Sequence, residues 1–318
     1  FLNGKNGATV QQVSNINAYL APSANAFVRP ISTVPDERGK MQFGNHPYYA
    51  NALMLTPQDS RDLLETDPDA LKFVRSLYGS KELINGCPRK CIWISDRAFG
   101  EAKLIPSLRD RIEMVEKARA MKSKDIQAKK LMLTPYRFRD QYEGEKMVLA
   151  VPIVSSENRP YLPVDLIDPR SIVHNKAFAL YDVPIWNMSL IASRLHWVWI
   201  GTVCVRLEMR FSYSNTMGWN TFPLPKLTEK NKSDLTRCAE NILLAREKHF
   251  PATIADLYDP KTMPENLRQA HENNDETLER IYIGRQFNND TERLEKLFDL
   301  YTKMTSSTNG KETLESAS

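Results

Sequence analysis

The chain has 318 residues, of which 42% are hydrophobic and 26% are charged, as expected for a globular protein with a substantial core. This length suits two domains, or one large domain with an appendage. Because there is neither an apolar run of about 18 residues nor a signal segment, we expect a cytoplasmic protein without a membrane partner.

The net charge of +4 is unevenly distributed along the chain. Residues 228–318 hold 13 basic and 17 acidic residues, whereas residues 1–227 hold 30 and 22. Residues 109–139 alone contain ten basic and four acidic residues. This upstream excess favours a surface that meets phosphates, although solvated helix faces also accumulate Lys and Arg.

The cysteine pattern argues against a metal site. Cys87 and Cys91 are close in sequence, but Cys204 and Cys238 are far away and lie in apolar contexts. A zinc site would need two more ligands at a recognisable spacing. We therefore expect four reduced thiols, no metal and no cofactor in this chain.

The first 203 residues suggest helices and strands in mixed order. A turn-rich segment precedes a helix that is predicted to start at Thr56-Pro57. Leu108, Ile112, Val115 and Arg119 share one face of a second, strongly charged helix. The predicted helices cover 57–78, 107–131 and 185–203, and the predicted strands cover 90–95, 146–154 and 171–180.

Apolar and polar residues alternate over ten positions, 205–214, which is the period of a half-buried strand. The polar face would carry Arg206, Glu208, Arg210, Ser212 and Ser214. Same-face neighbours on a strand lie about 6.6 Å apart, close to two base-pair steps of about 3.4 Å. Such a row of donors and acceptors suits base edges in a groove, but the pattern alone is more typical of a solvent-facing charge ladder.

Beyond Leu227 the pattern becomes helical, and amphipathic helices are predicted over 230–249, 264–283 and 290–304. The tail, 306–318, is polar and predicted to be disordered. The fold class is therefore α+β: a mixed or antiparallel sheet domain with flanking helices, followed by a small all-α domain.

No complete catalytic motif is present. The glycines form no phosphate-binding loop and no nucleophile elbow, and the five histidines are dispersed. Residues 45–48 (Asn-His-Pro-Tyr) resemble the Asn-Pro-Pro-Tyr loop of amino-methyltransferases, but His replaces a proline. Asp96 with Glu101 and Lys103 resembles a nuclease cluster, but only four residues separate the two acids. We expect no catalytic residues here.

Several ordered segments resemble the C-terminal part of MmeI-like Type IIL restriction–modification enzymes. They are distributed over about residues 13–304 and comprise 15–20, 73–75, 81–86, 151–159, 193–199, 203–207, 213–223 and 257–264. Enzymes of this family join a nuclease, an adenine-N6 methyltransferase, a target recognition domain and a helical C-terminal domain in one polypeptide.

The resemblance implies a domain order. Residues 1–16 would be the trailing edge of the methyltransferase domain, 17–227 the target recognition domain and 228–305 the helical domain. S-adenosyl-L-methionine and Mg²⁺ would serve upstream domains and not this chain. The implied partners are double-stranded DNA and the upstream methyltransferase and nuclease domains, for which the chain would position the target adenine.

The resemblance also implies site residues. Glu208 and Arg210 match a paired position that sets one base pair of the target, Ser212 matches the next position, and Lys176 matches a partner position. Arg can bind guanine through two hydrogen bonds, and Glu can accept from cytosine N4. The family more often has Lys and Asp at the pair and Arg in place of Ser212, which implies a different target sequence.

Supporting DNA contacts are expected from the polar residues around the strand and from the basic segment 109–139. The candidates are Arg206, Ser214, Asn215, Thr216, Asn220 and Arg159. Two alternatives stay open: a self-contained nucleic-acid methyltransferase or nuclease, and a helical protein-interaction module centred on 228–318. The DNA-reading hypothesis requires Lys176, Glu208, Arg210 and Ser212 to protrude side by side into solvent.

Overall fold

The computed structural model describes the backbone of residues 3–4, 7–8, 13, 15–23, 25–122, 124–208 and 210–315. Side chains are described from residue 13 to residue 306 within those ranges. β1 (Asn3–Gly4) and β2 (Gly7–Ala8) form a small antiparallel pair. Most of the segment 1–16, expected to close a methyltransferase domain, lies outside the described side chains.

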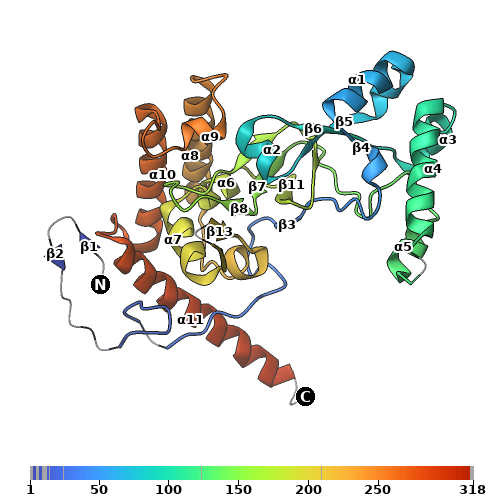
Figure 1. The fold of residues 1–318 in the computed structure, drawn as a ribbon. Coiled ribbons are helices and arrows are strands. Elements are labelled where there is room, and N and C mark those ends of the chain that lie inside the picture. The colour runs from blue at the N-terminus through green and yellow to red at the C-terminus, as the bar shows by residue number, and fades with distance from the viewer. Residues whose placement is uncertain are drawn as a thin grey trace.

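A mixed sheet of order β10-β5-β6-β4 forms one end of the molecule, at the right of Figure 1. β10 runs parallel to β5, and the other neighbours are antiparallel. The strands are β4 (Met54–Leu55), β5 (Val74–Tyr78), β6 (Arg89–Ile92) and β10 (Ile172–Val173). The helical segments in this part of the chain are η1 (Asn51–Leu53), α1 (Pro57–Thr66), η2 (Pro68–Phe73), α2 (Ser80–Asn85), η3 (Asp96–Ala98), α3 (Phe99–Ala102), α4 (Pro106–Ala120) and α5 (Ile126–Leu131).

Local signals explain where α1 begins and ends. The Thr56 side chain accepts from the Asp59 amide, and Asp59 returns a bond to the Thr56 amide, which is a capping box. Asp67 precedes Pro68 and leaves the helical conformation, because proline disfavours that conformation in the residue before it. The helix predicted over 57–78 is therefore too long, and its last residues form β5.

Two antiparallel sheets occupy the centre. The larger has the order β3-β11-β7-β9, and the smaller has the order β12-β13-β8. Their strands are β3 (Gln42–Phe43), β7 (Val148–Pro152), β8 (Val154–Ser155), β9 (Asp165–Ile167), β11 (Ala177–Tyr181), β12 (Arg206–Leu207) and β13 (Arg210–Ser212). β7 is buried along its whole length, as its continuous apolar run predicts.

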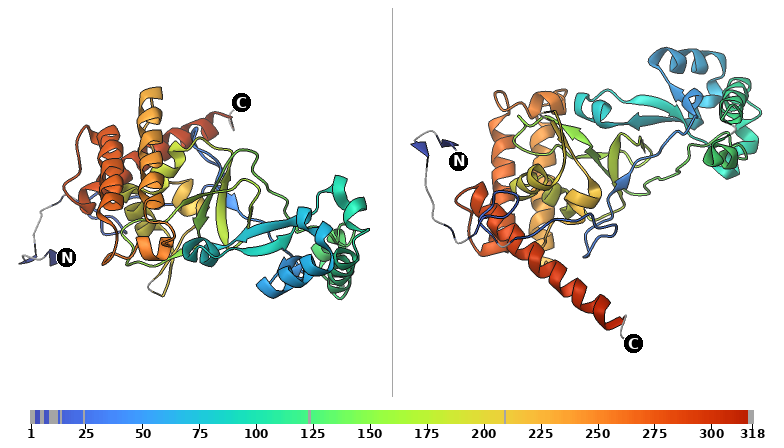
Figure 2. Two further views of the ribbon diagram at one scale, coloured as in Figure 1. Left: turned by 90° about the horizontal axis from the view of Figure 1, so that it is seen from above. Right: turned by 60° about the horizontal axis from the view of Figure 1, so that its bottom comes forward.

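Helices form the other end of the molecule, opposite the mixed sheet (Figure 2). α8 and α10 pack side by side, α6 packs against α8, and α11 packs against α7. The segments are α6 (Trp186–Ile191), α7 (Arg194–Val203), the π-helical turn η4 (Asn215–Trp219), α8 (Glu229–Glu247), α9 (Ile254–Leu257), α10 (Glu265–Ile283) and α11 (Asp290–Glu315). α11 continues beyond residue 306, where the composition predicts disorder.

One large hydrophobic core joins the central sheets to the terminal helices. It contains Val151 and Phe178 from the central sheet, Trp199 from α7, and Leu278 and Phe298 from α10 and α11. Trp199 packs on Phe298 with ring centroids 5.3 Å apart. A second, smaller core lies within the mixed-sheet end.

Buried polar groups join the same two parts. The Asp275 carboxylate of α10 accepts from the Arg194 amide at 2.7 Å and from the Tyr161 hydroxyl at 2.9 Å. The side-chain amide of Asn274 donates to the Ser189 carbonyl at 3.0 Å. These bonds satisfy polar atoms that the shared core removes from water.

The predicted α+β class, with mixed and antiparallel sheets followed by helices, is confirmed. Two predicted helices are interrupted, however. The segment 107–131 divides into α4 and α5, and 185–203 divides into α6 and α7. In the second case the Ser193 hydroxyl accepts from the His196 amide and starts a new helix.

Candidate nucleic-acid interface

The segment 205–214 is a hairpin and not one strand. Arg206 pairs with Phe211 and Leu207 pairs with Arg210, so the chain reverses direction between Leu207 and Arg210. Glu208 has φ 56°, in the left-handed region that such tight turns require. Met209 lies outside the described residues.

The prediction of a single ten-residue strand is therefore wrong. Its apolar positions divide accordingly, since Phe211 and Tyr213 are buried but Val205 and Leu207 are exposed. The two-residue period could not distinguish the two structures, because it is expected both for one long strand and for the two arms of a hairpin. The loop also lacks the Asn-Gly or Asp-Gly pair that would have indicated a turn.

The hairpin tip carries the predicted base-reading pair. The Arg210 guanidinium donates to the Glu208 carboxylate at 2.9 Å, and both side chains are largely in solvent. Nearby, the Arg206 guanidinium lies 4.8 Å from the centroid of the Phe211 ring. Glu208 and Arg210 are thus paired with each other at an exposed site. A base edge can replace either partner there without exposing a buried group.

Ser212 and Lys176 lie closer to the central sheet. Ser212 is half-buried in β13, where it is opposite Val154 of β8. The Lys176 side chain is exposed, and its carbonyl accepts from the Ser80 hydroxyl. The Ile153 amide, next to Val154, donates to that same hydroxyl at 2.9 Å. Ser80 therefore connects the Lys176 turn to the strand that supports Ser212.

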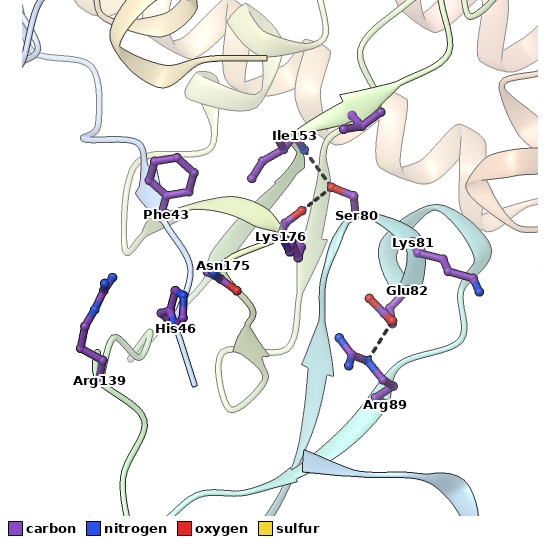
Figure 3. A pocket seen from close by; sticks show the side chains of 11 residues that line it. Phe43, His46, Ser80, Lys81, Glu82, Arg89, Arg139, Ile153, Asn175 and Lys176 are labelled. Atoms are coloured by element: carbon purple, nitrogen blue, oxygen red, sulfur yellow. Dashed lines mark hydrogen bonds and ion pairs between the residues drawn. The ribbon is translucent and has the colours of Figure 1, made fainter. Parts of the chain in front are cut away.

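Lys176 lines a cleft of about 800 Å³ between the mixed sheet and the central sheet. Figure 3 shows Phe43, His46 and Arg139 on one side of this cleft and Ser80, Lys81, Glu82 and Arg89 on the other. Val154 of β8 also lines it, so the cleft reaches the base of the hairpin.

The charge of this cleft is mainly positive. Glu82 is paired with Arg89 at 2.9 Å, while Lys81 and Lys176 add further positive charge to the lining of the cleft. Burial, followed by the nearby Arg139, lowers the pKa of His46, and Asp140 opposes this effect. Sequence analysis missed Lys81 and Arg89, because nothing in their local pattern distinguishes them from ordinary surface cations.

A second hollow of about 510 Å³ adjoins the first, and Phe43 and Arg139 line both. Asn215 and Asn220 line this second hollow. The Asn215 amide donates to the Met41 carbonyl at 3.0 Å. Asn220 is 3% exposed, and its amide donates to the Ile31 carbonyl at 2.7 Å. The Asn220 nitrogen is therefore used within the fold, and the expected contact of this residue with a DNA backbone stays a prediction.

The other predicted supporting residues also make contacts within the protein. The Ser214 hydroxyl accepts from the Met217 amide and lies 3.1 Å from the Thr216 hydroxyl, so both shape the start of η4. Arg159 lines a separate hollow with Asp259 and Lys261, and burial lowers the pKa of its guanidinium. The structure thus does not bring Arg159 to the cleft that Lys176 lines.

One buried arginine organises the basic segment. Arg119 is fully buried and donates to the carbonyls of Pro47, Tyr48, Leu131, Thr134 and Arg137. It thereby holds the loop that carries His46 beside the loop that carries Arg139. Burial lowers the pKa of Arg119 to about 10.

Neither partial catalytic motif forms a site. The Asn45 amide donates to the Tyr142 and Val173 carbonyls, and its oxygen accepts from the Tyr142 amide, so the side chain is fully used. Asp96 pairs with Arg137, whereas Glu101 pairs with Lys72. In the part of the chain that the structure describes, no three His, Cys, Asp or Glu side chains gather as a metal site. No helix described here is long and apolar enough to cross a bilayer.

The fold and the exposed hairpin define a class: an α+β recognition domain joined to a helical domain. The family model "MmeI, target recognition domain" matches residues 22–226, and the model "MmeI, C-terminal domain" matches residues 227–308. The chain belongs to this family and comprises its target recognition domain followed by its C-terminal domain.

Two relatives support this assignment. DNA methyltransferase A of Bacillus subtilis (strain 168) is 37% identical over 301 residues, which are 93% of this chain and 34% of that protein. The solved structure of the Type IIL restriction-modification enzyme MmeI in complex with DNA aligns with a TM-score of 0.85 and 30% identity. That alignment covers 92% of this chain and 39% of MmeI, so this chain spans little more than a third of either relative.

Proposed function

We propose that this chain reads a specific sequence in double-stranded DNA and positions a target adenine for a methyltransferase domain of the same polypeptide. The observation that carries the proposal is the hairpin tip, where Glu208 and Arg210 are exposed and paired at 2.9 Å. An Arg–Glu pair complements the two members of one G·C pair, since Arg binds guanine O6 and N7 and Glu accepts from cytosine N4.

In this proposal Ser212 and Lys176 read positions next to that base pair. The cleft lined by Lys81, Arg139 and Lys176 follows the phosphates and fixes the register, because phosphate contacts position a protein on the duplex. Arg206, Ser214, Asn215 and Thr216 are proposed as supporting contacts to the DNA backbone around the hairpin and η4. The domains extend over 17–227 and 228–305, and the protein acts in the cytoplasm.

The alternatives receive less support. A self-contained methyltransferase or nuclease would need the residues of 45–48 or of 96–103 to be available, and they are bonded to other groups. A separate helical interaction module would need its own core, whereas α8, α10 and α11 share theirs with the central sheets. S-adenosyl-L-methionine and Mg²⁺ belong to upstream domains in this proposal.

The test is selection of bound sites from a randomised duplex library by the full-length protein and its R210A variant. We expect the unaltered protein to enrich one motif. R210A should lose preference at one base pair, worth about 1–3 kcal/mol, and keep the others.

A matched control is R237A on α8, which removes another exposed arginine paired with an acid, Asp234. R237A should leave the motif unchanged. An R210A motif identical to that of the unaltered protein contradicts the assignment of Arg210, and enrichment of no motif by the unaltered protein contradicts the proposed function.

A further inference from the structure

Phe43 is an aromatic side chain in an unexpected place. The residue is 51% exposed, although it belongs to the edge strand β3 of the central sheet. It lines both hollows of the interface, so it lies at the point where they meet. In Figure 3 it lies on the same side as His46 and Arg139, across from Ser80.

The backbone around Phe43 is held firmly. Phe43 is opposite Phe178 in β11, and the two rings lie 4.6 Å apart between centroids. Phe178 in turn contacts the buried Tyr213 ring at 5.6 Å. A Cβ on the next residue, Gly44, would lie 2.5 Å from the carbonyl oxygens of Val173 and His174. The backbone that follows β3 therefore passes very close to the backbone of residues 173–174. The ring is thus presented on a rigid support.

The surroundings of the ring are cationic. Lys81, Arg139 and Lys176 line the first hollow, and Lys40 lines the second. The nearby Asp140 is engaged by Arg139 at 2.9 Å. An apolar partner protein would desolvate these cations, which is costly. A nucleic acid instead offers phosphates to the cations and flat base faces to the ring.

We propose that Phe43 stacks on a base face of the bound DNA and so fixes the position of the duplex in the cleft. This inference rests on the proposed DNA-reading function and adds a contact that carries no sequence information by itself, because every base has a π face. The base can belong to an opened step of the duplex or to a nucleotide turned out of it.

The first experiment measures binding of the full-length protein to a duplex that carries the motif enriched by the unaltered protein. Base–aromatic stacking is worth about 1–3 kcal/mol, which corresponds to roughly 5- to 150-fold in affinity. F43A and F43L should both weaken binding to this extent, with the dependence on salt unchanged, whereas F43W should restore it. F250A is the control, since Phe250 is also exposed but belongs to the helical end.

F43L separates stacking from a simple apolar wedge, because leucine keeps the apolar volume without a π face. Unweakened binding by F43L, or by F43A, overturns the inference. If the unaltered protein enriches no motif, the proposed function fails first, so the two failures are distinguishable. Thermal unfolding of each variant establishes that the loss of affinity does not come from loss of the fold.

The second experiment uses fluorescence. The five tryptophans of this chain are buried, so the difference in iodide quenching between the F43W variant and the unaltered protein reports on the introduced indole. Binding of the duplex should quench it and protect it from iodide, whereas the indole introduced by F250W should stay accessible. A duplex with 2-aminopurine at successive positions then locates the base, because the position whose brightening F43A increases is the one that stacks on Phe43. No protection of the F43W indole overturns the inference.

Discussion

Arg119 shows how one residue can support a surface that it does not reach. Its side chain donates to five backbone carbonyls, in the loop at Pro47 and Tyr48 and in the segment that runs from the end of α5 to Arg137. Those loops carry His46 and Arg139, two residues of the cleft. A buried guanidinium costs desolvation, which its many hydrogen bonds offset.

Replacing Arg119 with methionine should lower the free energy of unfolding by about 3 kcal/mol, because buried carbonyls lose their donors. R119K keeps the charge but has fewer donors, so its free energy of unfolding should lie between those of R119M and the unaltered protein. Urea unfolding monitored by circular dichroism provides the values. Equal stability of R119M and the unaltered protein would show that the carbonyls find other donors.

Sequence patterns foresaw the place of Arg119 but not its role. Its helical face was predicted from Leu108, Ile112 and Val115, and all four side chains are buried as expected. Two of the five carbonyls that this arginine binds, those of Pro47 and Tyr48, lie 72 and 71 residues before it in the sequence. No local pattern carries that information.

At the level of secondary structure elements, the hairpin is the main difference between expectation and structure. The two-residue period correctly places Phe211 and Tyr213 inside and Arg206, Glu208 and Arg210 outside. It does not show the chain reversal, because Glu208 is an unusual residue for the left-handed conformation. Lys176 was predicted as a site residue only through the family resemblance, because its turn is connected to the hairpin by the distant Ser80 and no local pattern relates the two.

A strained loop residue suggests a conflict between stability and recognition. E208N should keep or raise the free energy of unfolding, by up to about 1 kcal/mol, because asparagine tolerates positive φ. The same change should alter the base preferred at the position read by Glu208. Urea unfolding and site selection, applied to the same variant, check both effects.

A fall in stability for E208N would show that the Arg210–Glu208 ion pair outweighs the backbone strain. The Q58A variant of α1 provides a surface control, since Gln58 bonds only to neighbours on its own helix.

At the level of the whole molecule, the terminal helices and the sheets behave as one folded unit. Asp275 of α10 is a probe of their contact, because its side chain accepts hydrogen bonds from the Arg194 backbone amide and the Tyr161 hydroxyl. Burial raises its pKa to about 7 from the usual 3.8, and the bonds from Arg194 and Tyr161 oppose that rise, as does the Arg293 charge.

A raised carboxyl pKa means that the folded state keeps a proton that the unfolded chain has lost between about pH 4 and pH 7. Stability from Asp275 is therefore complete below its unfolded pKa and declines as the pH rises through its folded pKa. The slope is at most about 1.4 kcal/mol per pH unit. D275N, which keeps the shape and the acceptor for the Arg194 amide, should lose this slope.

Urea unfolding at about pH 5 and about pH 8 measures the effect, and the difference between D275N and the unaltered protein isolates it from other carboxylates. Parallel profiles for the two proteins would mean that Asp275 is ionised throughout, stabilised by its donors.

The shared core has a consequence for how relatives of this protein acquire new specificities. Exchanging the segment 22–226 between two such proteins would pack Trp199 and its neighbours against C-terminal helices from the other protein, whose side chains fit a different core. Misfit there costs stability before any base is read. The Glu208–Arg210 loop, by contrast, touches little besides solvent and its own arm, so point changes at its tip are the cheaper evolutionary path.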